Sequence, residues 1–115
     1  MADWPQLSPA PCDIRDEDKV KATISSILNA HGRIDGLVNN AGGQFSAPIA
    51  SISLKGWDAV VRTNLHGGFL MARECYVQWM VNHGGSIVSI VADMGRAFQK
   101  WRIAAPLAQG WLTSR

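Results

Sequence analysis

Charge, long apolar runs and reactive side chains are all scarce in this sequence. Only 17% of its 115 residues are charged, and basic and acidic residues are interspersed to a formal net charge of +2. This balance provides no concentrated positive surface for nucleic acid or a membrane. No stretch approaches the roughly 18 apolar residues of a membrane-spanning helix, and the start lacks the pattern of a secretory leader. We therefore expect a cytoplasmic protein that binds neither nucleic acid nor membranes.

Residues that commonly hold metals or form disulfides are few. Cys12 and Cys75 are a single candidate pair, with neither the spacing of a zinc site nor the density of a disulfide scaffold. The three histidines share no metal-ligand spacing. We therefore expect reduced, mostly buried thiols and no metal site.

What is present predicts one compact domain over residues 1–115, because 47% of the chain is hydrophobic. Prolines in polar company predict an irregular lead-in over residues 1–10. A helix is expected from Asp16 to Gly32, since an acidic first turn precedes apolar residues at helical spacing. A second helix, capped by Ser53 and ending before Gly84, would span roughly 29 residues, or about 43 Å.

Two apolar segments have the length and composition of strands. Residues 34–38 form a short apolar run, and residues 86–92, SIVSIVA, are β-branched enough for a strand covered on both faces of a parallel sheet. Alternating strands and helices predict an α/β fold, in which the ends of the strands lie along one rim of the sheet.

The first of these strands leads into Asn39, Asn40, Ala41, Gly42 and Gly43, on that rim. Ligands of doubly wound sheets bind outside the carboxyl ends of strands, where glycines allow close approach to the backbone and amide side chains can donate and accept. The residues are equally compatible with a tight turn that needs left-handed conformations. The residues alone leave both interpretations open.

Four motifs together resemble the short-chain dehydrogenase/reductase family. They are CDIRD at residues 12–16, NNAG at 39–42, TNL at 63–65 and GGSIVSI at 84–90, and they follow one another in the family's order and spacing. Two segments, GGQFSAP at residues 42–48 and KGWDAVVRTNLHGGF at residues 55–69, are similar in sequence to the peroxisomal trans-2-enoyl-CoA reductase branch of the family. The resemblance covers about residues 11–95. It implies an incomplete Rossmann-like, doubly wound parallel sheet with about three strands and two long helices, the first strand ending at Asp13.

The resemblance also implies site residues and a cofactor, NAD or NADP. Asp13 and Ile14 would lie beside the adenine, and Asn39, Asn40, Ala41 and Gly42 along the ribose and nicotinamide. Asn64 matches the catalytic asparagine, which in the family disturbs its helix and holds a water of the proton relay. Asparagine is a mediocre helix residue, so a local irregularity fits, although a polar residue facing solvent is the simpler alternative.

Several parts of the family pattern are absent from the sequence. The glycine-rich phosphate turn should precede Asp13, and the catalytic serine, tyrosine and lysine fall on Ala92, Ala105 and Gln109. Proton donation from a tyrosine needs a nearby cation to lower the pKa of its hydroxyl group. These positions supply neither the tyrosine nor the cation. The resemblance therefore implies a fragment of an NAD(P)-dependent short-chain oxidoreductase that acts on a small molecule, an enoyl-CoA or a related carbonyl substrate. We expect this fragment to be inactive alone.

Two further expectations follow from the missing segments. Exposed helix faces and an unpaired edge strand would make the chain marginally stable and favour homo-oligomers or other association. The alternative function is accordingly a non-catalytic interaction fragment, or pseudoenzyme, that pairs with a full-length homologue. A third possibility is a receiver-like signalling domain, which would need a cluster of acidic residues at a strand end. This sequence has no such cluster.

The divergent tail, residues 96–115, predicts a frameshift. One synonymous choice of codons for Lys100–Ser114, read from the third base, gives M-A-H-S-G-A-A-R-A-G-M-A-N-F, which resembles the reductase branch where its tyrosine and lysine would lie. Sequencing the gene around codon 95 is expected to show the shift. A tail of constant length, read in the same frame in related genes, would contradict it.

Overall fold

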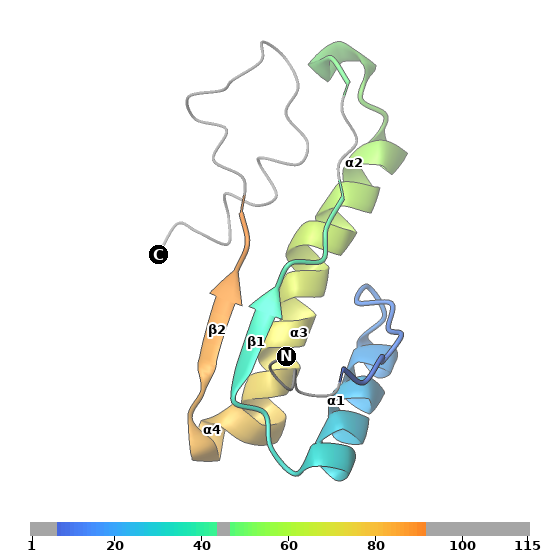
Figure 1. Cartoon of the computed structure of the whole chain (residues 1–115). Coiled ribbons are helices and arrows are strands. Elements are labelled where there is room, and N and C mark those ends of the chain that lie inside the picture. The colour runs from blue at the N-terminus through green and yellow to red at the C-terminus, as the bar shows by residue number, and fades with distance from the viewer. Residues whose placement is uncertain (1–6, 44–46, 92–115) are drawn as a thin grey trace, which may run out of the picture.

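The computed structural model describes residues 7–43 and 47–91 (Figure 1). The chain forms α1 (Glu17–His31), β1 (Gly36–Asn39), a short 3₁₀ turn η1 (Ile49–Ser51), a long helix in five segments and β2 (Ser86–Ser89). The five segments of the long helix are α2 (Leu54–Val60), η2 (Val61–Gly67), α3 (Gly68–Cys75), η3 (Tyr76–Met80) and α4 (Val81–His83).

Both helices begin and end where their capping residues predict. The Asp16 carboxylate accepts a hydrogen bond from the backbone N–H of Lys19 at 3.1 Å, and Gly32 ends α1 with φ 76°. Ser53 Oγ accepts from the backbone N–H of Gly56 at 3.0 Å, at the start of α2. Each side chain satisfies an N–H that has no partner within its own helix, and Gly32 adopts the left-handed conformation that glycine tolerates best.

The long helix is continuous but not uniformly α-helical. Its segments η2 and η3 are π-helical, with wider turns than the α-helical segments on either side. Asn64 lies in the middle of η2, where the sequence predicted a local irregularity. The second π segment, η3, was not foreseen from the sequence.

The two strands pair in parallel, with Leu37 beside Ile87 and Val38 beside Val88. β1 starts later than its apolar run suggested, at Gly36, and ends at Asn39, while β2 ends earlier than expected, at Ser89. The described residues contain two strands rather than about three. The segment expected to form a strand up to Asp13 makes no ladder, because no strand within residues 7–43 and 47–91 lies next to it. Instead, Cys12 and Ile14 pack against the core.

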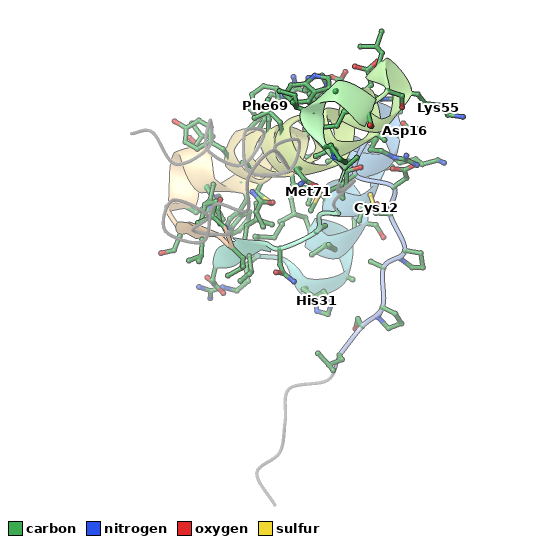
Figure 2. The ribbon with its side chains drawn as sticks, turned by 90° about the horizontal axis from the view of Figure 1, so that it is seen from above. Cys12, Asp16, His31, Lys55, Phe69 and Met71 are labelled. Carbon is green, nitrogen blue, oxygen red and sulfur yellow. The ribbon has the colours of Figure 1, made fainter. Side chains whose placement is uncertain are left out.

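The core lies between α1, the long helix and β1. Its buried members are Val20, Ile24, Ile34, Cys75 and Met80. Leu37 from the sheet and Met71 from α3 pack against this cluster, and Figure 2 shows Met71 directed into the interior while Phe69 lies on the outer side of the helix. Burial raises the pKa of the Cys75 thiol, helped by the neighbouring Glu74 carboxylate, so this cysteine stays protonated. Cys75 is buried, as expected, and Cys12 is partly buried.

The face of the sheet opposite the helices is exposed, which corrects the prediction of a strand covered on both faces. Side chains alternate along a strand, so Val38 and Val88 point away from the helix side, where Leu37 packs. Val38 is 65% exposed and Val88 is 52% exposed. The sequence of β2 is that of a strand buried on both faces, but the described residues provide a layer on only one.

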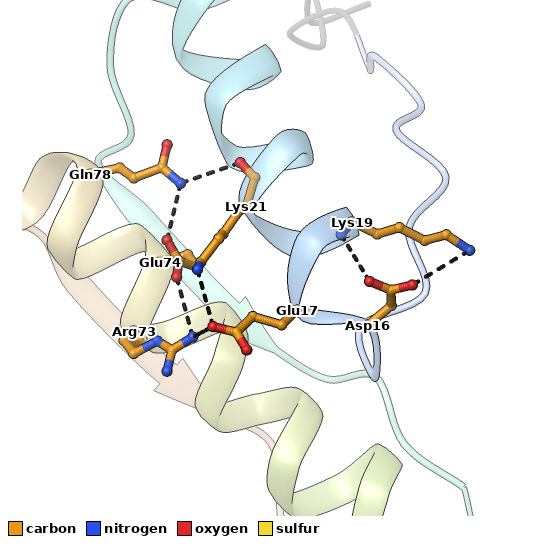
Figure 3. Close-up of polar contacts among 7 residues, drawn as sticks. All are labelled: Asp16, Glu17, Lys19, Lys21, Arg73, Glu74 and Gln78. Atoms are coloured by element: carbon orange, nitrogen blue, oxygen red, sulfur yellow. Dashed lines mark hydrogen bonds and ion pairs between the residues drawn. The ribbon is translucent and has the colours of Figure 1, made fainter.

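A polar network joins α1 to the long helix (Figure 3). Arg73 donates to the Glu17 carboxylate at 2.6 Å, and Lys21 pairs with the same carboxylate at 3.1 Å. These two cations hold the pKa of Glu17 below its usual value, and Lys21 has the larger effect of the two. The network fixes how the two helices lie against each other.

No helix in the described part of the chain is long and apolar enough to cross a membrane.

Candidate functional site

The candidate site is built around Asn64, in the π-helical segment η2. Asn64 is only 6% exposed, so the alternative that it faces solvent is wrong. Its side chain points to the loop that follows β1. The Asn64 Nδ2 group donates to the backbone carbonyl of Gly43 at 2.9 Å, and Asn64 Oδ1 accepts from the backbone N–H of Gly43 at 2.9 Å. One side-chain amide thus pairs with both polar groups of one backbone residue.

This pairing requires close approach of the loop backbone to the helix. A Cβ atom on Gly42 would lie 3.0 Å from Asn64 Oδ1, tighter than an ordinary contact. The first loop residue is also fixed, because Asn39 Nδ2 donates to the carbonyl of Gly68 at 3.1 Å. Asn39 and Asn64 therefore tie the two ends of residues 39–43 to the long helix.

Between these two ties lie Asn40, Ala41 and Gly42, all exposed at the carboxyl end of β1. The backbone of these residues is held in place while their side chains remain accessible. Amide and backbone groups at the end of a parallel strand can donate to and accept from the hydroxyl groups of a ligand. The interpretation of this segment as a simple surface turn accounts for neither tie.

The second group of predicted residues, Asp13 and Ile14, reaches the same helical segment from the other end of the chain. Ile14 lies over Gly67, the last residue of η2, where an added Cβ would be 2.6 Å from two Ile14 side-chain atoms. Gly67 is therefore needed for this contact. Ile14 thus contacts η2 at Gly67, and the loop of residues 39–43 contacts it at Asn64.

The Asp13 carboxylate is held by its neighbour Arg15. Its Oδ1 accepts from the backbone N–H and the Nε–H of Arg15 at 3.0 and 2.9 Å, and its Oδ2 accepts from Nη2 at 2.9 Å. These hydrogen bonds keep the pKa of Asp13 well below its usual range, so the carboxylate is ionised at neutral pH. With three hydrogen bonds accepted, a carboxylate retains room for a further donor.

An open pocket of about 350 Å³ lies beside this carboxylate. It is lined by Asp13, Arg15, Asp16 and Arg62. Arg62 comes from η2, two residues before Asn64, so the pocket and the clamped loop share one helical segment. The positions at which the family would have its serine, tyrosine and lysine, Ala92, Ala105 and Gln109, lie outside the described residues.

Two parallel strands joined by a long helix, with a fixed polar loop at the end of the first strand, form part of an α/β domain of the doubly wound type. The family model for short chain dehydrogenase matches residues 2–104. The chain belongs to the short-chain dehydrogenase/reductase family.

Relatives confirm this assignment. The chain is 34% identical over 101 residues to a peroxisomal 2,4-dienoyl-CoA reductase of Danio rerio, covering 88% of this chain and 34% of the relative. It is 37% identical over 82 residues to D-threitol dehydrogenase of Mycolicibacterium smegmatis, covering 71% of this chain and 32% of the relative. The chain therefore spans about a third of the length of these relatives.

A solved structure agrees with the fold. A citronellol catabolism dehydrogenase of Pseudomonas aeruginosa superimposes with a TM-score of 0.79 at 46% identity, covering 88% of this chain and 41% of that one. The incomplete Rossmann-like α/β fold expected from the motifs is thereby confirmed.

Sequence reasoning did not single out Arg15, Arg62 or Gly67 as site residues. Gly67 carried a usable signal, because a glycine three residues after Asn64 in a helix costs stability unless something approaches it closely. Arg15 and Arg62 carried no such signal, since surface arginines are common. The position of Arg62 beside Asp13 also depends on how the long helix packs.

We predict that Asn64→Ala will release the loop. The substitution removes both hydrogen bonds to Gly43, each worth about 1 kcal/mol net. Hydrogen exchange at the Gly43 amide, followed by NMR, should accelerate about tenfold or more. Asn40→Ala is the control, since its side chain is exposed and it should leave this amide unchanged. Equal exchange in the unsubstituted chain and in Asn64→Ala would show that the amide pair does not hold the loop.

We also predict that Gly67→Ala will destabilise the chain by about 1–3 kcal/mol, because the new methyl group overlaps Ile14. Urea unfolding followed by tryptophan fluorescence measures the change. In the double variant Ile14→Ala/Gly67→Ala the overlap is gone, so the loss should be smaller than the sum of the two single losses. Strict additivity would mean that the two residues do not meet as described.

Proposed function

We propose that this chain supplies one rim of the NAD(P) site of a short-chain oxidoreductase. The observation that carries the proposal is the double hydrogen bond between Asn64 and Gly43, because it fixes an accessible loop at the end of a parallel strand. A nicotinamide cofactor supplies the hydride in this family. Asn39, Asn40, Ala41 and Gly42 would contact its ribose and nicotinamide.

Asp13 and Ile14 would hold the adenine end of the same cofactor. The fit is supported by the chemistry of the Asp13 carboxylate, which is ionised, fixed by Arg15 and still able to accept from an exocyclic amino group. Ile14 offers an apolar contact and is itself located by Gly67.

Asn64 would act mainly as a positioning residue. Its amide is engaged with Gly43, so its first contribution is to hold the loop against η2. The family resemblance adds a role in a proton relay, to which the π-helical turn is suited because wide turns are frequent at functional sites. A relay also needs the serine, tyrosine and lysine, whose places in this sequence hold Ala92, Ala105 and Gln109. We therefore propose that the chain does not turn over substrate alone.

The substrate we propose is an enoyl-CoA or a related carbonyl compound. The supporting observation is that the relatives include a peroxisomal 2,4-dienoyl-CoA reductase. In addition, the sequence segments that contain or follow Asn40 and Asn64 resemble those of enoyl-CoA reductases. We also propose a cytoplasmic localisation, on the basis of the composition. One relative is peroxisomal by name, so a peroxisomal localisation is the alternative.

The second candidate function is a non-catalytic fragment that pairs with a full-length homologue. The exposed sheet face favours it, because Val38 and Val88 present apolar surface that a complete domain would cover. The two candidates differ in whether this chain binds a dinucleotide by itself.

Titration with NADH and NADPH tests the proposal. We predict weak binding, in the millimolar range, because the helix N-terminus that receives the pyrophosphate has no counterpart before Asp13 in the sequence. NMR shifts should concentrate on the backbone amides of Gly42 and Gly43. Asp13→Ala should weaken binding about tenfold through loss of a charge-assisted hydrogen bond, whereas Asp58→Ala, an exposed control on α2, should have no effect.

Absence of saturable binding for both cofactors, together with binding to a full-length homologue, would replace this proposal by the second candidate. Shifts that ignore residues 39–43 would also contradict it.

A further inference from the structure

The segment of residues 14–17 is attached to the long helix at both of its ends. At one end Ile14 packs over Gly67. At the other end Arg73 Nη2 donates to Glu17 Oε1 at 2.6 Å (Figure 3). Gly67 and Arg73 are separated by less than two turns of the long helix, or about 9 Å of rise. A short stretch of one helix therefore holds the whole segment.

This segment belongs to the part of the chain that carries the carboxylates of the pocket. Asp13 directly precedes it, Asp16 lies within it, and both line the pocket. The backbone N–H of Asp16 donates to the carbonyl of Asp13 at 3.1 Å, and the Asp16 carbonyl accepts from the backbone N–H of Val20 at 3.0 Å. One hydrogen-bonded turn thus joins Asp13 to the start of α1, where Glu17 is the first residue. A shift of Glu17 would be transmitted to Asp13 through this turn.

We propose that Arg73 is a positioning residue for the adenine end of the cofactor site, because it holds the start of α1, and with it Asp13, in place on the long helix. This inference rests on the proposed function, in which Asp13 accepts a hydrogen bond from the adenine. Arg73 is not among the residues that line the described pocket, so it would act through Glu17 and not by touching the cofactor.

The guanidinium group of Arg73 is itself held by several neighbours. Its Nη2 lies 3.4 Å from Glu74 Oε1 as well as 2.6 Å from Glu17 Oε1, and its Cζ lies 5.2 Å from the centre of the Phe69 ring. Glu74 is only 5% exposed, and Gln78 Nε2 donates to it at 3.1 Å. A planar guanidinium can pair with two carboxylates and lie over an aromatic ring at the same time. Arg73 therefore presents a fixed donor to Glu17, as positioning requires.

Lys21 makes the second charge contact with Glu17, but it cannot position α1. Its Nζ lies 3.1 Å from Glu17 Oε1, and both residues belong to α1. Lys21 therefore neutralises the carboxylate without tying α1 to another helix. Lys21 also lowers the pKa of Glu17 more than Arg73 does. A role that depended on charge alone would accordingly be more sensitive to the loss of Lys21 than to the loss of Arg73.

The rest of α1 has its own attachments. Val20 and Ile24 are buried in the core. Ser25 Oγ donates to Gln78 Oε1 at 2.9 Å, further along both helices. Substitution of Glu17 should therefore loosen the first turn of α1 without unfolding the helix. Because exposed ion pairs contribute little free energy, we expect a change of about threefold to fivefold in affinity for the adenine half of the cofactor.

Separate titration of the two halves of the cofactor tests the inference. Adenosine monophosphate probes the Asp13 end, and reduced nicotinamide mononucleotide probes the end at residues 39–42, each followed by NMR with the full chain. In Glu17→Ala we expect about threefold to fivefold weaker binding of adenosine monophosphate and unchanged binding of the nicotinamide mononucleotide. Asp18→Ala is the matched control, because it removes the same charge from the same turn of α1, and it should leave both affinities unchanged.

Arg73→Met and Lys21→Met provide the second measurement. Each substitution removes one positive charge from beside Glu17, but only Arg73→Met should weaken the binding of adenosine monophosphate. Circular dichroism of both variants checks that the fold is kept. Arg73→Met also removes a partner of the buried Glu74 carboxylate, so Glu17→Ala is the cleaner of the two tests.

Three results would overturn the inference while leaving the proposed function intact. The first is unchanged binding of adenosine monophosphate in Glu17→Ala. The second is equal weakening of both halves of the cofactor, which would indicate a general loosening of the fold. The third is an equal loss in Lys21→Met and Arg73→Met, which would indicate an effect of charge alone. An unsubstituted chain that binds neither adenosine monophosphate nor NADH would overturn the proposed function, and this inference with it.

Discussion

The amide pairing between Asn64 and Gly43 is the constraint on which the site depends. A side-chain amide has one donor group and one acceptor group, and both meet the backbone of a single loop residue at 2.9 Å. Asn64 reaches that loop from the π-helical segment η2, so the widened turn and the clamped loop occur at the same place in the fold.

The same segment organises the other end of the site. Gly67 ends η2 without a side chain, so Ile14 can pack against the helix and bring Asp13 beside Arg62. The segment η2 thus makes two contacts. Asn64 holds the loop of residues 39–43 through hydrogen bonds, and Gly67, its last residue, receives the apolar side chain of Ile14. The two groups of predicted cofactor residues, far apart in the sequence, both pack against η2.

Local patterns predicted most of this fold. Capping by Asp16 and Ser53, the stop at Gly32 and the parallel pairing of the two apolar segments all followed from residue types at fixed spacing. The site was predicted through motifs, which name Asn64 but not its partner. That Gly43 is the partner of both Asn64 hydrogen bonds could not be predicted, because this contact depends on the exact distance between a loop and a helix. The π segment η3 left no recognisable pattern.

The exposure of β2 explains the largest difference between expectation and structure. Its sequence has the composition of a strand between two layers, and a sequence records the surroundings in which it was selected. The chain spans about a third of its relatives, and within the described residues the sheet has helices on one face alone. Val38 and Val88 are therefore exposed on the face that the helices of the described residues leave open, although their residue types are those of a buried strand.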